Sequence, residues 1–241
     1  MLKERKPPGQ RKLDISLSEQ AYQNILDQIL RGTLPLGAPL SRRNLAEQFG
    51  MSFIPVAAAL QRLERDGLVE SRPQAGTRVK IPTVDEIRGR FEMREALECQ
   101  SARLCAERMT FQEQLDLKRA AKHMDTLRSR VAAGDVDEEM AFAIQQYHTE
   151  FHSKIALYAR SQPLCTAIES NHVLVFNWLF NTVSGTHNTL PQGFHLDLAE
   201  SICTGDPQVA ESAMRSHVHF GIDDVLQAFE PGVQSGWRGK R

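Results

Sequence analysis

The sequence contains no apolar run approaching the length of a membrane-spanning helix, about 20 residues, and therefore predicts no membrane span. Its first residues, MLKERKPPGQRK, are charged and lack the apolar core of a secretory signal, which favours a cytoplasmic protein. The four cysteines form no C-x-x-C pair and are expected to be reduced. No glycine-rich phosphate loop and no G-x-S-x-G motif is present, which argues against the enzyme classes that depend on them.

The net charge of −1 combines a basic N-terminal part with an acidic C-terminal part. Residues 1–80 contain 13 Lys and Arg against 8 Asp and Glu, a net charge of +5. The remaining residues contain 16 against 22, a net charge of −6. This asymmetry favours a nucleic-acid-binding head attached to a separate body.

Two short helical segments in the basic part are joined by Gly50-Met51. The first spans Ser41–Phe49, and the second lies within SFIPVAAALQRLERDGLV at residues 52–69. Ser52 is a favourable N-cap residue, and the apolar side chains behind it recur on one helical face: Val56, Leu60 and Leu63. The pair indicates a helix-turn-helix, whose second helix enters the DNA major groove, although an ordinary αα-hairpin would show the same pattern.

A β-hairpin is predicted directly after these helices. Residues 68–72 and 77–81 have the composition of short strands around a turn at 73–76. A further helix is predicted within residues 16–32, and residues 33–40 are predicted as a turn. Three helices followed by a hairpin predict a winged helix-turn-helix, whereas a plain αα-hairpin does not account for the wing.

The run QILRGTLPLGAPLSRRNLAEQFGMS, then Pro55-Val56 and LQRLERDGLVESRPQAGTRV, resembles the DNA-binding domain of GntR-family transcriptional regulators over residues 21–79. The resemblance implies that Arg43 contacts DNA, that Arg42 adds charge and that the amides near Ser52 meet phosphate. It also places the wing tip at three residues, Gly76, Thr77 and Arg78.

The second helix departs from the family pattern. GntR regulators typically carry S-R-x-P-V-R-E-A-L there, with two arginines that contact DNA. In this chain Phe53 and Ala57 occupy the arginine positions, and Ala58 replaces the acid. Either other basic residues supply the affinity, or the operator differs and these apolar side chains meet thymine methyls, or the chain is a regulator with weakened DNA binding.

Everything after Pro82-Thr83 has helical patterning. Six helices are predicted, at residues 84–107, 111–133, 137–159, 162–183, 190–204 and 207–229. The segments EMREALE, YHTEFHSKIA and HLDLAESICTGDPQVAESAMRSH resemble the FCD effector-binding domain of the FadR subfamily. Six helices are more similar to the VanR-like group than to the longer FadR group.

The predicted fold is therefore mainly α, with an N-terminal winged helix-turn-helix and a C-terminal six-helix bundle. The predicted parts are a flexible basic tail at 1–15, the DNA-binding domain at 16–81, a linker at 82–84, the helical domain at 85–231 and a flexible tail at 232–241.

Four of the eight histidines form a pattern. His148 and His152 are four residues apart, so both project from one helical face, and His195 and His217 lie on later helices. Histidine pairs at this spacing also arise by chance. The metal-binding FCD regulators that the chain resembles use an aspartate and a histidine four residues apart and one histidine from each of two later helices. Here His148 stands at the aspartate position.

The resemblance implies that these four histidines bind a divalent metal. Four imidazoles suit Zn²⁺, with Ni²⁺ as the alternative, and the missing carboxylate should weaken Mn²⁺ or Mg²⁺. Because an all-histidine site leaves the metal charge uncompensated, a small anionic effector, a carboxylate, is expected beside it. Arg94 could bind that carboxylate or pair with Glu98 at i+4, and the sequence leaves both open.

An enzyme is the competing hypothesis. The run His148-Thr149-Glu150-Phe151-His152 differs from the H-E-x-x-H motif because its glutamate lies two residues after the first histidine. A helical metalloenzyme would explain the histidines and leave the winged helix unexplained. The sequence therefore predicts a homodimeric, ligand-responsive regulator, a repressor by family default, that binds palindromic operator DNA and has no enzymatic activity.

Overall fold

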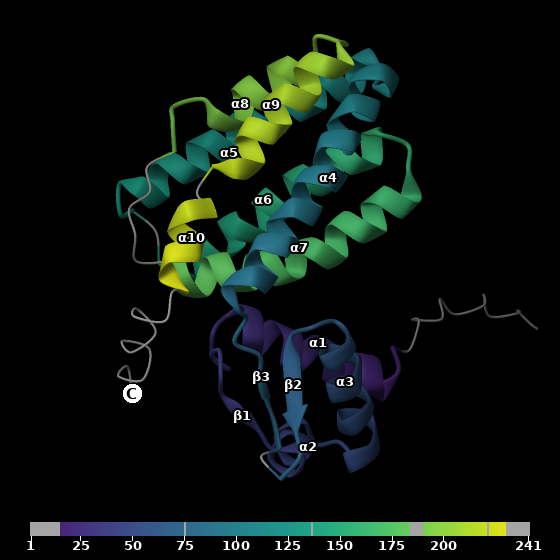
Figure 1. The fold of residues 1–241 in the computed structure, drawn as a ribbon, viewed down its shortest axis with the longest axis vertical. Helices are drawn as coiled ribbons and strands as arrows, with labels where there is room; N and C mark the ends of the chain where they lie inside the picture. The colour runs from purple at the N-terminus through teal and green to yellow at the C-terminus, as the bar shows by residue number, and fades with distance from the viewer. Residues whose placement is uncertain (1–14, 75, 136, 184–189, 221, 230–241) are drawn as a thin grey trace, which may run out of the picture. The chain divides into compact units, whose positions relative to one another are not determined.

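The computed structural model describes residues 15–74, 76–135, 137–183, 190–220 and 222–229. The chain divides into two compact units, of which one contains residues 36–80 and the other continues from residue 81. Figure 1 shows helices accompanied by three strands in the first unit, and helices alone in the second. Residues 1–14 of the predicted tail at 1–15, the predicted tail at 232–241, and residues 184–189 between two of the predicted helices lie outside the described residues.

The first unit is a winged helix-turn-helix, as predicted. Its elements are α1 (Leu17–Leu30), β1 (Pro39–Leu40), α2 (Arg42–Phe49), α3 (Phe53–Arg65), β2 (Val69–Arg72) and β3 (Gly76–Val79). The strands form an antiparallel sheet in the order β1-β3-β2. The strand β1 was not predicted, because two residues that include a proline resemble a turn; a proline is tolerated there because β1 lies at the sheet edge.

The two ends of α2 are formed by a capping serine and a left-handed glycine. The Ser41 hydroxyl accepts a hydrogen bond from the Asn44 amide at 3.3 Å and caps α2. Gly50 ends the same helix with φ at +62°, a left-handed conformation that glycine adopts without strain. The core of the unit consists of fully buried apolar side chains, among them Ile25, Ile29, Val56, Leu63 and Val79.

The second unit is helical throughout its described residues. Its helices are α4 (Val84–Arg108), α5 (Phe111–Ala132), α6 (Glu138–Tyr158), α7 (Gln162–Val183), α8 (Phe194–Ile202), α9 (Pro207–His219) and α10 (Ile222–Ala228). The starts of α4 and α5 are fixed by capping boxes, Thr83 with Glu86 and Thr110 with Glu113. Asp206 caps α9, whose first residue is the predicted Pro207.

Two predicted helices differ from the structure. The predicted helix at 190–204 starts only at Phe194, because Gly193 before it is left-handed with φ at +76°. The predicted helix at 207–229 is divided into α9 and α10, because Phe220 has an extended backbone. The helical character of the unit is confirmed, but its described residues form seven helices instead of six, so the helix count no longer favours the VanR-like group.

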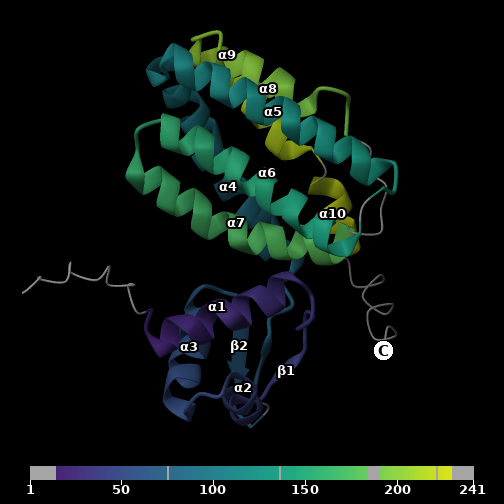
Figure 2. The same ribbon diagram turned by 180° about the vertical axis from the view of Figure 1, so that it is seen from behind.

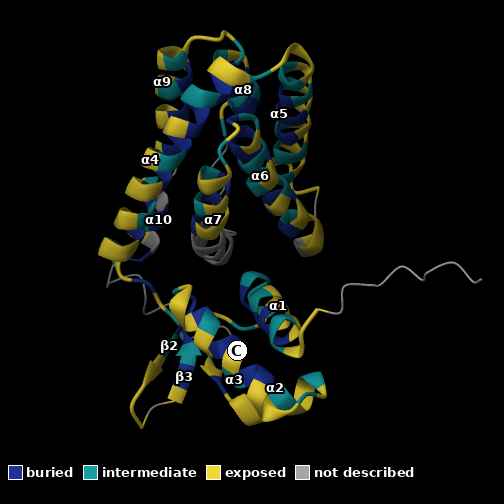
Figure 3. Ribbon diagram, turned by 90° about the vertical axis from the view of Figure 1, so that its right-hand side faces the viewer, coloured by how far each residue is buried: buried dark blue, intermediate teal, exposed yellow. Residues whose placement is uncertain are grey.

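The helix α4 packs against α6, α7, α8 and α9, while α5 packs against α6 and α8 (Figure 2). The shared core contains apolar residues from five of these helices, including Ala102, Leu117, Phe151, Ile202 and Met214. Figure 3 shows the same division, with buried residues on the inner helix faces and exposed residues outside. Within the described residues, no helix combines the length and apolar character needed to cross a membrane.

The first unit allows a test of its core against its surface. Leu63 of α3 is fully buried, whereas Ile54 of the same helix is 79% exposed. Leu63→Ala is expected to lower the free energy of unfolding by about 2–5 kcal/mol, because it removes buried methyl groups and leaves a cavity. Ile54→Ala is the control and should change it by less than about 0.5 kcal/mol, as measured by urea denaturation. If both variants lose the same free energy of unfolding, the assignment of Leu63 to the buried face of α3 and Ile54 to the exposed face is wrong.

Candidate metal centre and DNA-reading surface

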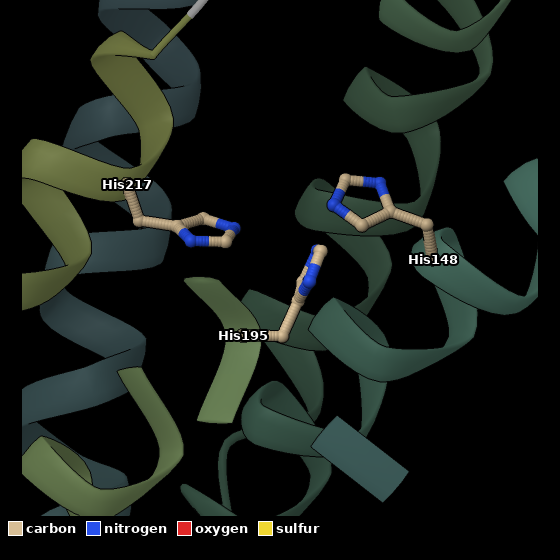
Figure 4. Close-up of side chains that lie close together, drawn as sticks. All are labelled: His148, His195 and His217. Carbon is tan, nitrogen blue, oxygen red and sulfur yellow. The ribbon is translucent and has the colours of Figure 1, made fainter. Parts of the chain in front are cut away.

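The four histidines that the sequence selects lie together in the structure. His148 and His152 lie on α6, His195 in the first turn of α8 and His217 in the last turn of α9. The Nε2 atom of His152 lies 3.2 Å from Nε2 of His148 and 3.3 Å from Nε2 of His217. Figure 4 shows His148, His195 and His217 converging from separate helices, and one ligand atom of each lies within 4.8 Å of the others.

A carboxylate fixes the orientation of the His152 ring. Glu98 on α4 is 2% exposed, and its Oε2 atom contacts Nδ1 of His152. The contact with a carboxylate favours the tautomer that carries its proton on Nδ1, and this tautomer presents a lone pair at Nε2. The His152 lone pair is therefore directed toward His148 and His217.

A second carboxylate, Asp125, fixes the orientation of the His195 ring. The Oδ1 atom of Asp125, on α5, lies 2.6 Å from Nδ1 of His195 and accepts a hydrogen bond from the His195 amide at 3.0 Å. Its Oδ2 atom accepts one from the Leu196 amide at 3.0 Å. Asp125 therefore caps α8, whose N-cap residue Gly193 has no side chain for this purpose.

This arrangement leaves Nε2 of His195 as a buried lone pair, and the described residues offer it no hydrogen-bond partner. Nδ1 of His217 is buried in the same condition within the described part of the chain. Unpaired buried acceptors are costly, and a cation bound between the rings would satisfy Nε2 of His195. Carboxylates behind ligating histidines are also the usual outer contacts of protein metal sites.

The histidines of the cluster are uncharged at neutral pH. Burial, and then the proximity of His152, keeps the pKa values of His148 and His217 well below the ordinary histidine value. Burial also lowers the pKa of His152 to about 4, although Glu98 opposes this shift. Neutral imidazole is the form that binds metals, so the residues present fit a divalent cation with nitrogen ligands.

Glu98 also binds two further groups. Its Oε1 atom lies 2.7 Å from Nε of Arg94 and 2.7 Å from Nε2 of His172. Burial alone would raise the pKa of Glu98, but Arg94, His152 and His172 outweigh it and hold that pKa well below its usual range. The ion pair between Arg94 and Glu98, one of the two sequence alternatives, is present.

Arg94 also faces the histidine cluster, because its Nη2 atom lies 3.5 Å from Nε2 of His152. A second guanidinium, Arg128 on α5, donates to Oε1 of Gln145 at 2.5 Å. Burial lowers the pKa of Arg128 to about 10. Sequence reasoning missed Arg128, Asp125, and the contacts of Glu98 with His152 and His172, since each acts through residues distant in the chain and no local motif indicates it.

The predicted DNA contacts on the two helices lie at the surface of the first unit. Arg42 and Arg43 are exposed in the first turn of α2, and Ser52 is exposed at the N-cap of α3. Phe53 is 52% exposed, and Ala57, one turn further, is partly exposed. Their positions are compatible with DNA contact, which stays a prediction.

The wing differs from the sequence expectation at two positions. Thr77 is buried, and its hydroxyl lies 3.1 Å from the Ser71 hydroxyl, so its side chain is unavailable to DNA. Nε of Arg78 lies 2.5 Å from Oε1 of Glu70, which engages its charge. Gly76 remains exposed at the start of β3, with φ at +77°. Thr77 is buried because alternate residues of a strand share a face, and Val79 of that face is in the core.

A winged helix-turn-helix followed by a helical unit of this kind defines a DNA-binding transcriptional regulator. The family model for bacterial regulatory proteins of the gntR family matches residues 17–79, and the FCD domain model matches residues 90–220. The chain belongs to the GntR family and carries an FCD domain. The predicted family is confirmed.

Curated proteins similar to this chain are named as transcriptional repressors or regulators. The chain is 28% identical to the "Probable D-xylose utilization operon transcriptional repressor" of Paenarthrobacter nicotinovorans, over 88% of this chain and 95% of that protein. It is 25% identical to the transcriptional repressor RspR of Escherichia coli, over 88% and 90%. It is 33% identical to the regulator McbR of Escherichia coli, over 67% and 70%.

Solved structures show the same fold. Escherichia coli McbR/YncC superposes with a TM-score of 0.71 at 22% identity, over 90% of this chain and all of that one. A GntR regulator from Rhodococcus sp. RHA1 gives 0.71 at 18%, over the same shares. The family consists of bacterial regulatory proteins and the matched relatives are transcriptional regulators, so the metalloenzyme alternative is set aside.

Asp125 provides a test of the α8 cap. Asp125→Ala is expected to lower the free energy of unfolding by about 1.5–3 kcal/mol, because it removes charge-assisted hydrogen bonds to two amides and a ring. Asp135→Ala, at an exposed position after α5, is the matched control and should cost less than about 0.5 kcal/mol. Thermal or urea unfolding monitored by circular dichroism measures both. If Asp125→Ala and Asp135→Ala have the same free energy of unfolding, Asp125 does not stabilise α8.

Proposed function

We propose that the chain is a cytoplasmic, homodimeric repressor whose helical unit binds a divalent metal and a small carboxylate, and whose winged helix binds palindromic operator DNA. The observation that carries the proposal is the convergence of four neutral imidazoles, two of them oriented by the carboxylates of Glu98 and Asp125. Repression is supported by the names of two relatives, which are repressors.

The proposed metal ligands are His148, His152, His195 and His217. Nitrogen ligands suit Zn²⁺, with Ni²⁺ as the alternative, whereas Mg²⁺ and Mn²⁺ prefer oxygen. A bound divalent ion supplies a positive centre that accepts an anion as a further ligand. The chain itself contributes the fixed rings: Glu98 holds the proton of His152 at Nδ1, and Asp125 holds that of His195.

The proposed effector is anionic because two guanidinium groups, Arg94 and Arg128, lie close enough to the cluster to bind an anion. Arg94 lies at the cluster, with its Nε atom engaged by Glu98 and its Nη2 atom directed at His152. The largely buried Arg128 contacts an uncharged glutamine, and the described residues provide it with no ion pair. A guanidinium presents two parallel donors that match a carboxylate, so Arg94 and Arg128 are the proposed effector contacts.

The DNA-binding mode follows from the helix-turn-helix. In a homodimer, each α3 enters the major groove of one half-site, and Arg42, Arg43 and the wing contact the backbone. An effector bound more tightly by one arrangement of the two heads shifts the equilibrium toward it. The coupling is reciprocal, so operator DNA should lower the affinity for an inducer.

The metal site is tested by changing one histidine. Zn²⁺ affinity of the purified protein, measured by chelator competition, should fall at least about tenfold in His148→Ala, because one of four ligands is lost. His219→Ala is the matched control, since His219 is exposed and pairs with Glu95. His148→Asp should retain metal and bind Mn²⁺ more strongly relative to Zn²⁺, because it adds an oxygen ligand. Unchanged Zn²⁺ affinity in His148→Ala would refute the site.

DNA binding and its control by an acid are tested together by gel retardation of the region upstream of the chain's own gene. Retardation is expected at low salt, and one member of a carboxylic acid panel should abolish it. Arg128→Lys should raise the acid concentration for half-release at least about tenfold, because the bidentate geometry is lost. Arg119→Lys, exposed on the same helix, should not. Failure to retard any genomic fragment would overturn the proposal.

A further inference from the structure

The exposed face of α3 begins with apolar side chains. The buried face of this helix is formed by Pro55, Val56, Ala59, Leu60 and Leu63. On the opposite side, Phe53 is 52% exposed and Ile54 is 79% exposed. One turn further, Ala57 is partly exposed and Ala58 is exposed.

The polar residues of α3 come only later. Between Phe53 and Leu60 the sequence FIPVAAAL contains no side chain that donates or accepts a hydrogen bond, and Gln61 is the first. Hydrogen-bonded readout of guanine or adenine needs Arg, Lys, Asn or Gln at such positions. The first two turns of α3 therefore cannot recognise base edges through hydrogen bonds from their side chains.

Phe53 and Ile54 form an exposed apolar pair on this face, and contiguous exposed apolar surface is typical of interaction sites. In a helix-turn-helix, the N-terminal residues of the second helix are those that reach the base edges. The edge that offers an apolar group in the major groove is thymine, through its C5-methyl. Phe53 and Ile54 thus occupy the base-reading position with the chemistry that fits this methyl.

The charges around this face match DNA and not an apolar partner. Arg42 and Arg43 are exposed in the first turn of α2, which packs against α3. Arg65 is exposed in the last turn of α3, and the Arg72 side chain of β2 is 58% exposed, with its Nη2 atom 3.5 Å from Oε1 of Glu70. An apolar strip with cations on the neighbouring elements is complementary to a thymine-containing groove between two phosphate backbones.

We propose that α3 reads thymine methyl groups through Phe53 and Ile54, while the small side chains of Ala57 and Ala58 allow the helix to approach the groove floor. Sequence preference then comes from apolar contact, and most of the affinity comes from arginine contacts to phosphate. This inference rests on the proposed DNA-binding function.

Deoxyuridine provides a direct probe, because it differs from thymidine only by the missing methyl group. Duplexes bound by the full-length protein are selected from a random library, and each thymine of the selected site is then replaced by uracil. At the contacted positions, each replacement should lower the affinity roughly three- to fivefold in fluorescence anisotropy, the contribution of one buried methyl. Replacement outside the site should have no effect.

Variants assign the effect to α3. In the double variant Phe53→Ala with Ile54→Ala, the affinities for thymine and uracil duplexes should become equal. Ile15→Ala is the matched control, since Ile15 is 57% exposed before α1, and it should keep the full thymine preference. Phe53→Arg with Ala57→Arg should steepen the dependence of log affinity on log salt by about 0.9 for each new phosphate contact.

The outcomes separate the two proposals. Binding of selected duplexes with equal affinity for thymine and uracil would overturn methyl reading and leave the DNA-binding function intact. A thymine preference that persists in the double alanine variant would also overturn the assignment to α3. Absence of binding to any duplex at low salt would overturn both.

Discussion

Two carboxylates determine how the helical unit presents two of its histidines. Glu98 and Asp125 each lie against the Nδ1 atom of one ring, and each thereby directs the opposite nitrogen into the cluster. Without them, His152 and His195 could adopt either tautomer and could rotate. The carboxylates come from α4 and α5, and these two rings come from α6 and α8, so their orientation depends on the packing of four helices.

Glu98 links the histidine cluster to α4, the helix that follows the wing in the chain. The helix α4 begins at Val84, shortly after β3 ends at Val79, and carries both Arg94 and Glu98. An effector that binds Arg94 must compete with Glu98, which already accepts from its Nε atom. Because Glu98 also contacts His152, a shift in this balance would act on a proposed metal ligand and on α4 together. This arrangement provides a physical route by which occupancy of the site can act on the DNA-binding unit.

The sequence predicted what local signals encode. Caps, glycines and apolar spacing indicated the helices and the wing, and the i, i+4 spacing of His148 and His152 predicted that the two rings share a face. It did not reveal Asp125, because 70 residues separate it from His195. The burial of Thr77 could have been inferred from its alternation with Val79. The division of the last predicted helix at Phe220 has no comparable signal in the sequence, since Gly221 alone does not require a break.

The cap that Asp125 provides has a consequence for how the chain can vary. The helix α8 has nine residues, and helices of that length are marginal without tertiary support. One carboxylate both satisfies its first amides and sets the tautomer of His195. The start of α8 and the orientation of the His195 ring therefore depend on the same carboxylate, Asp125. A substitution at Asp125 changes both. Among regulators with this arrangement, positions 125 and 195 should accordingly vary as a pair, and a change at one should be found with a compensating change at the other.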